Sequence, residues 1–108
     1  VEEMELENIH NLDFSNLIFK AKQEKNYRLS IRYYYLWLLK SLTDSQVIQW
    51  DIEKTNSDYS HEIKDAQLKK EFLFLSYIYD YSWYGGFELN ENHFNKTEAD
   101  FLKLISKK

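Results

Sequence analysis

The sequence predicts an all-α fold, a compact bundle of about five helices with an N-terminal helical hairpin and one short extended strap. Apolar residues recur every three to four positions along most of the chain, and this spacing places them on one face of a helix. The 108 residues include two glycines and no proline, too few for the many tight turns of a β-sandwich or barrel. A chain of this length forms one domain. We expect it over residues 13–108, after an acidic extended leader over residues 1–12.

The first two helices are expected at residues 14–25 and 27–43. Asp13 precedes the first helix, and its carboxylate accepts the free N–H groups of a first turn. Asn26 tolerates a left-handed backbone and is expected to end that helix. A connection of one or two residues between the two helices makes them an antiparallel helical hairpin. The second helix is apolar around most of its circumference, so we expect it at the centre of the fold.

A strap is expected at residues 47–52, where the helical period breaks and Trp50 is expected to lie on the hairpin. Three further helices are predicted at residues 56–64, 66–84 and 91–106.

Residues at the ends of these helices support the boundaries. Thr55 is the expected cap of the third helix, and the side chain of Asp58, three residues later, is expected to accept a hydrogen bond from the backbone N–H of Thr55. Gly85 and Gly86 are expected to stop the fourth helix, because two glycines favour a left-handed exit. Asn90 is the expected cap of the last helix.

Charge and composition exclude several classes of function. The net charge is −4 and cysteine is absent, so there is no disulfide, and nucleic acid is not expected as a partner. The longest apolar run, residues 33–39, is far shorter than the about 20 residues that cross a bilayer. Residues 20–40 carry six basic side chains against Glu24 alone. A solvated helix face and a weak dock on an anionic lipid surface both remain open for that stretch.

Residue sets that carry catalysis or hold a metal are missing from the sequence. His10, His61 and His93 have no second histidine three or four positions away, whereas zinc needs three or four converging ligands. No glycine-rich loop opens a helix after a strand. We therefore expect no enzymatic activity, no cofactor and no metal.

Aromatic residues are unusually frequent, with three tryptophans, nine tyrosines and seven phenylalanines. They predict either an aromatic core or a partner-binding surface, since tyrosine and tryptophan dominate interface hot spots. Tyr33, Tyr34 and Tyr35 point in directions about 100° apart on a helix, so at least one is expected to face solvent or a partner. Tyr77 and Tyr81, an i,i+4 pair beside the apolar stripe, are the next candidates.

Arg28 and Arg32 are also spaced i,i+4, and like charges repel at that spacing unless an anionic group lies between them. A carboxylate from another helix, such as Asp58, Glu62 or Asp80, is one interpretation. A carboxylate or phosphate of a ligand is the other.

The sequence resembles the C-terminal domain called domain of unknown function 4129. The resemblance rests on an ordered set of short stretches that spans most of the chain: Glu7-Asn8-Ile9-His10, Asp13-Phe14, Asn26-Tyr27-Arg28-Leu29-Ser30-Ile31-Arg32, Tyr35-Leu36, Leu39-Lys40, Ile48-Gln49-Trp50, Lys54-Thr55-Asn56-Ser57-Asp58-Tyr59 and Trp83-Tyr84-Gly85.

The resemblance implies a bacterial, membrane-anchored protein with this domain on the cytoplasmic face and with its tether outside these 108 residues. Members carry the domain after a transmembrane helix, and some have a transglutaminase-like domain across the membrane. No activity is implied. Two departures are visible: Gln46 stands where members often have glycine, which predicts an exit from the second helix that is strained or shaped differently, and Gly86 stands where a larger residue is common, which loosens the loop before the last helix.

Together these observations predict a non-catalytic helical interaction or scaffold domain with a protein partner at or in the membrane. The alternative is a small-molecule, peptide or anion-binding domain that uses Arg28 and Arg32. The candidate interaction or structural-motif residues are Arg28, Arg32, Tyr34, Thr55, Asn56, Tyr59, Tyr77, Tyr81, Trp83, Tyr84 and Gly85.

Overall fold

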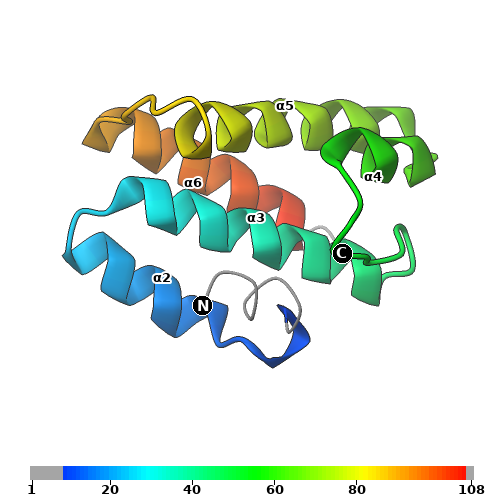
Figure 1. Ribbon diagram of the computed structural model, residues 1–108, viewed down its shortest axis with the longest axis horizontal. Helices are drawn as coiled ribbons and strands as arrows, with labels where there is room; N and C mark the ends of the chain where they lie inside the picture. The colour runs from blue at the N-terminus through cyan, green and yellow to red at the C-terminus, as the bar shows by residue number, and fades with distance from the viewer. Residues whose placement is uncertain (1–8, 107–108) are drawn as a thin grey trace.

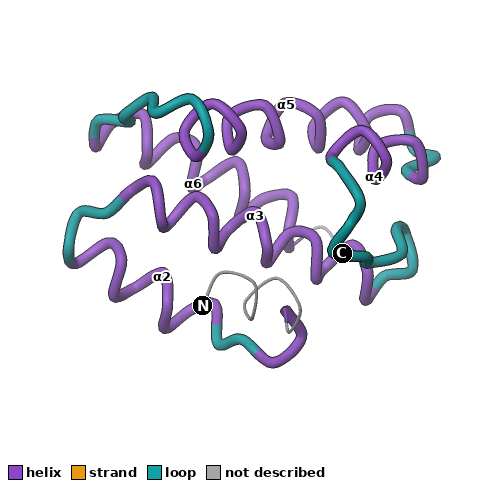
Figure 2. Tube along the Cα trace, in the orientation of Figure 1, coloured by secondary structure: helices purple, strands orange, loops and turns teal. Residues whose placement is uncertain are grey.

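A computed structural model describes residues 9–106, and the regular structure in this range is entirely helical. The elements in chain order are the 3₁₀ turn η1 (Ile9–Asn11) and the α-helices α2 (Phe14–Gln23), α3 (Tyr27–Asp44), α4 (Asn56–Glu62), α5 (Ala66–Trp83) and α6 (Glu91–Ser106). Figure 2 shows these helices joined by loops, the longest of which connects α3 to α4. The all-α bundle expected from the sequence is confirmed.

The helix α3 lies at the centre of the bundle. In Figure 1, α2 lies along one side of α3, whereas α5 and α6 lie on the other side, and α4 lies beside one end of α5. Ten residues of α3 are buried. The predicted central position of this helix is confirmed, and α2 and α3 form the predicted hairpin.

The expectation that one of the three consecutive tyrosines faces solvent or a partner is wrong. Tyr33, Tyr34 and Tyr35 are 6%, 4% and 6% exposed, because neighbouring helices cover α3 on several sides. Polar partners inside the bundle make this burial tolerable. The hydroxyl of Tyr34 donates to Glu98 of α6 at 2.6 Å, and that of Tyr35 bonds to Asn56 of α4. Burial and the bond to Glu98 raise the pKa of Tyr34 well above its usual value.

Side-chain caps begin the helices where the sequence places them. Asp13 accepts the N–H of Asn16 at 3.3 Å, and Asn90 accepts that of His93 at 2.8 Å. At the start of α4, a reciprocal capping box joins Thr55 and Asp58. The first turn of each of these helices leaves free N–H groups, which these side chains satisfy.

The end of α2 differs from its prediction in one residue. The left-handed position belongs to Lys25, with φ 56°, and not to Asn26. Asn26 has φ −90° and begins α3, where its side chain accepts the N–H of Leu29 at 3.1 Å. Because α2 and α3 are only a few residues apart, Asn26 serves as the N-cap of α3, and Lys25 takes the strained left-handed conformation that ends α2.

The end of α3 repeats this turn around Gln46, which has φ 63°. The N–H of Gln46 donates to the carbonyl of Thr43 at 3.0 Å, and that of Val47 donates to Leu42 at 2.9 Å. This pattern is the Schellman motif, whose left-handed position favours glycine because a Cβ atom is strained there. Of the two outcomes expected at Gln46, a strained exit or a differently shaped one, the structure has the strained exit.

Replacing Gln46 by glycine is expected to raise the free energy of unfolding by about 0.5–1 kcal/mol, because the relief of left-handed strain exceeds the added entropy of the unfolded chain. Urea unfolding followed by circular dichroism measures the change. Ser45→Gly is the matched control, since Ser45 has φ −85° and glycine there relieves no strain. An equal gain from both substitutions would contradict this explanation.

One of the two connecting segments differs from the sequence-based expectation. Residues 1–8 of the predicted leader lie outside the described residues. Its last part is not extended, because Ile9–Asn11 form the 3₁₀ turn η1, in which Ile9 is fully buried in the core. In the strap before α4, Trp50 stacks on the ring of Tyr59 of α4, with centroids 6.3 Å apart. Trp50 also packs against the core, and its contact with the hairpin stays a prediction.

Candidate functional site

Two arginines of α3 hold the C-terminal end of α5. The guanidinium of Arg28 donates to the backbone carbonyls of Ser82 at 3.2 Å and Trp83 at 2.5 Å. It lies 4.0 Å from the centroid of the Trp83 indole, and the guanidinium of Arg32 lies 4.4 Å from the same ring. The last carbonyls of a helix carry partial negative charge and the indole face attracts cations, so both features stabilise the two guanidinium groups.

Arg32 is the inner member of this pair and is 2% exposed. Its Nη1 donates to the hydroxyl of Tyr79 of α5 at 2.8 Å. In these contacts the two guanidinium groups meet main-chain oxygens, an aromatic ring and a phenol, none of which was expected from the sequence. Sequence reasoning missed these partners because main-chain carbonyls leave no signature in a residue pattern.

A pocket of about 420 Å³, which we call the tyrosine pocket, opens between α3, α4, α5 and the loop before α4. It brings together Thr55, Asn56, Tyr59 and Tyr84 of the residues singled out from the sequence. Its lining residues are Tyr35, Leu39, Trp50, Ile52, Lys54, Thr55, Asn56, Ser57, Tyr59, Tyr79, Asp80 and Tyr84.

A chain of polar and ring contacts crosses this pocket. The rings of Tyr35 and Tyr79 stack with centroids 4.1 Å apart, and the Tyr35 hydroxyl bonds to the side-chain oxygen of Asn56. The Nδ2 of Asn56 then donates to both carboxylate oxygens of Asp80, at 3.2 and 3.1 Å. Partial burial raises the pKa of Asp80 above its ordinary value, and the bond from Asn56 opposes that rise. Sequence reasoning considered Asp80 only as a partner for arginine and missed it as a pocket residue.

A second feature is a groove between α5 and α6, which we call the aromatic groove. Phe74, Tyr77 and Tyr81 line it from α5, Phe87 lines it from the following loop, and all four are exposed. The rings of Tyr77 and Tyr81 meet edge to face with their centroids 5.5 Å apart, and the ring centroids of Tyr81 and Phe87 are 5.1 Å apart. The structure therefore places two predicted candidates, Tyr77 and Tyr81, on one continuous aromatic surface.

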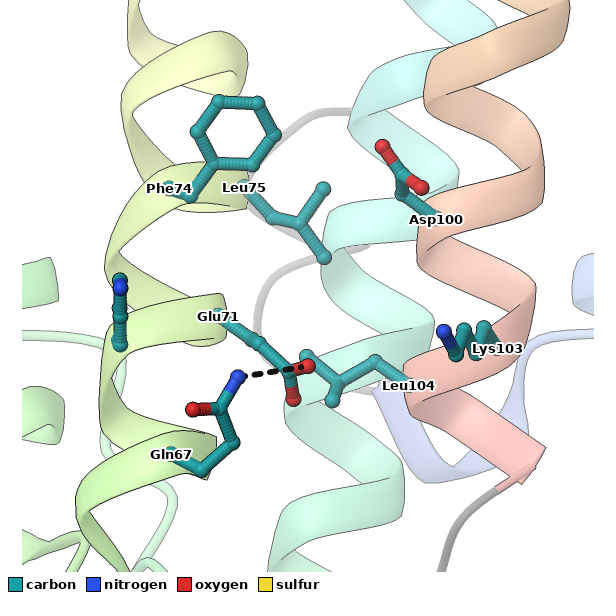
Figure 3. A pocket seen from close by; sticks show the side chains of 8 residues that line it. Gln67, Glu71, Phe74, Leu75, Asp100, Lys103 and Leu104 are labelled. Atoms are coloured by element: carbon teal, nitrogen blue, oxygen red, sulfur yellow. Dashed lines mark hydrogen bonds between the residues drawn. The ribbon is translucent and has the colours of Figure 1, made fainter.

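The aromatic groove consists of two adjoining hollows of about 280 and 290 Å³, which share Phe74 and Asp100 in their linings. Figure 3 shows one of them, with Phe74 and Leu75 on the α5 wall and Asp100 and Leu104 on the α6 wall. Charged residues line both hollows beside the apolar side chains; they are Lys70, Glu71, Lys96, Asp100 and Lys103.

The basic stretch of residues 20–40 is largely used inside the fold. Lys22 bonds to Glu98 at 2.7 Å, and Lys40 bonds to Asp44 at 2.8 Å. Arg28 and Arg32 contact α5 as described above, so four of the six bases have partners in the bundle. These contacts give four of the six bases a structural role.

Within residues 9–106, no group of three or more histidine or acidic side chains is arranged to hold a metal ion. The same part of the chain contains no helix with the length and apolarity that a membrane crossing requires.

Comparisons of the chain with family models, with curated proteins and with solved structures found no match. Over the described residues the chain is a helical bundle, and the tyrosine pocket and the aromatic groove bring together most of the candidate residues. Its function is therefore argued from these two features.

Proposed function

We propose that this chain is a non-catalytic interaction domain that binds an amphipathic helix of a partner protein in the aromatic groove. The observation that carries the proposal is the exposure of Phe74, Tyr77, Tyr81 and Phe87 in one line, at 54%, 62%, 48% and 47%. Contiguous exposed apolar surface of this kind marks interaction sites, and aromatic residues supply most of the binding energy in such sites.

The dimensions of the groove favour a helical partner. Its α5 wall runs from Gln67 to Tyr81, which corresponds to about 21 Å along a helix. A partner helix of about four turns has that length, and its apolar residues at i, i+3, i+4 and i+7 form one stripe. Such a stripe fits a groove that runs between two helices.

The charges at the groove favour an acidic partner. Lys70, Lys96 and Lys103 line it with two acids, Glu71 and Asp100, so basic groups are in excess. Acidic side chains that flank the apolar stripe of the partner would lie near these lysines and steer its association.

The proposal includes a tether to a membrane on its cytoplasmic face, with the partner at or in that membrane. The support for this part is the resemblance to domain of unknown function 4129, in which the matched stretches keep their order along the chain. The structure supports the part that concerns the groove.

A titration with a designed helical peptide tests the groove. The probe is a 14-residue peptide with leucines at i, i+3, i+4 and i+7 and glutamates on its flanks, added to ¹⁵N-labelled protein. We expect amide shifts confined to α5, α6 and the loop between them. Tyr77→Ser is expected to weaken binding at least tenfold, because it removes a ring from the centre of the groove.

Phe19→Ser is the matched control, since Phe19 is 59% exposed and lies on α2 outside the groove. It should leave the affinity unchanged. A peptide with lysines in place of the glutamates should bind more weakly. Equal losses from Phe19→Ser and Tyr77→Ser, or shifts spread over α2, would overturn the proposal.

A further inference from the structure

We propose that the tyrosine pocket is a binding site for an organic cation, an alkylammonium or guanidinium group, with Asp80 as its counter-ion. This site is separate from the aromatic groove and does not depend on the function proposed for it. The pocket of about 420 Å³ lies within the range of sites that bind small ligands or single side chains.

The charges in the pocket favour a cation. Asp80 is the acidic residue of the lining, and Lys54 is the basic one. The Nζ of Lys54 is already engaged, at 2.6 Å from Glu62 and 2.7 Å from the carbonyl of Gln49. Because Glu62 balances Lys54, the carboxylate of Asp80 is the unbalanced charge among the lining residues.

Asp80 has capacity to accept further hydrogen bonds. Its two oxygens share one donor group, the Nδ2 of Asn56, whereas an ionised carboxylate offers about four acceptor positions. Asp80 is exposed and therefore accessible to a ligand, and partial burial raises the pKa of its carboxyl group. A bound cation would stabilise the charged carboxylate, whereas a bound anion would be repelled.

The aromatic walls select an organic cation over a metal ion. Two stacked pairs line the pocket, Trp50 on Tyr59 and Tyr35 on Tyr79, and Tyr84 stands beside them at 74% exposure. Aromatic faces attract weakly hydrated cations such as ammonium and guanidinium groups. Hard metal ions require several oxygen ligands, and one carboxylate does not supply them.

The test is a titration of the ¹⁵N-labelled protein with n-butylammonium, with n-butylguanidinium and with their neutral isostere n-butanol. We expect both cations to shift the amides of Asn56 and Asp80, and butanol to bind at least tenfold more weakly. An acetylated Gly-Arg-Gly amide is the third ligand. If this peptide binds more tightly than butylguanidinium, the natural ligand is an arginine or lysine side chain of a protein. If butylguanidinium binds more tightly than the peptide, the natural ligand is a free small molecule.

Asp80→Asn keeps an oxygen that accepts from Asn56, so the variant is expected to fold and to bind both cations at least tenfold more weakly. Tyr84→Leu should weaken binding severalfold through the loss of a ring. Glu88→Gln, which removes an exposed acid outside the pocket, is the matched control and should bind like the natural chain. Unchanged affinity in folded Asp80→Asn, or equal binding of butanol, would overturn the proposal.

Discussion

Replacing Arg32 by alanine is expected to lower the free energy of unfolding by about 3–4 kcal/mol. The side chain is almost fully buried, lies on the indole of Trp83 and donates to the hydroxyl of Tyr79. Its removal leaves a cavity beside the ring and takes a hydrogen-bond donor away from a buried phenol. Few single substitutions in a domain of this size have a larger effect.

Urea unfolding of the variant, followed by circular dichroism and by tryptophan fluorescence, measures this loss. Arg28→Ala is the comparison, because Arg28 also bonds to α5 but is exposed, and we expect it to cost about 1 kcal/mol. Arg32→Met refills most of the volume and should recover part of the stability. A loss below about 1 kcal/mol in Arg32→Ala would show that the buried contacts do not hold α3 against α5.

Replacing Gly85 by alanine is expected to lower the free energy of unfolding by about 2–3 kcal/mol. A Cβ atom at this position would lie 2.6 Å from the carbonyl oxygen of Tyr81 and 3.1 Å from its Cδ1. That carbonyl also accepts the N–H of Phe87 at 3.3 Å in the turn that ends α5. The close atom belongs to the backbone of a helix, so it cannot move aside without disturbing this turn.

The neighbouring glycine provides the control for that prediction. Gly86 has φ 70° and no heavy atom within 4 Å of an added Cβ, so Gly86→Ala meets only left-handed strain and is expected to cost about 1 kcal/mol. Thermal and urea unfolding of the two variants compare the effects directly. Losses of the same size would contradict a steric origin at Gly85. Gly85→Ala should also weaken peptide binding in the aromatic groove, because Tyr81 and Phe87 both line it.

Features that depend on a few neighbouring residues could be predicted from the sequence. The capping residues Asp13, Thr55 and Asn90 begin their helices as expected, because a cap needs only one side chain and the next three backbone N–H groups. The central position of residues 27–43 followed from apolar residues on all sides of that helix. The end of α2 could not be predicted in this way. Asn26 could either end α2 or cap α3, and in the hairpin it caps α3 while Lys25 takes the left-handed position.

The contacts of the candidate sites could not be predicted in the same way. Arg28 meets Trp83 across 55 residues of sequence, and Asn56 meets Asp80 across 24. Tyr34 was a candidate for an exposed position and is buried against α6. Each of these results depends on which helix faces which, and a residue pattern within one helix does not contain that information.

The sequence alone therefore determined the class of fold, the number of helices and most of their first residues, because these follow from the spacing of apolar side chains and from local hydrogen bonds. The tertiary structure decided which aromatic residues form the core and which form the groove. It also decided that two arginines hold a helix end and that Asp80 lies in a pocket of tyrosines. These outcomes depend on long-range packing, that is, on which helix packs against which face of α3.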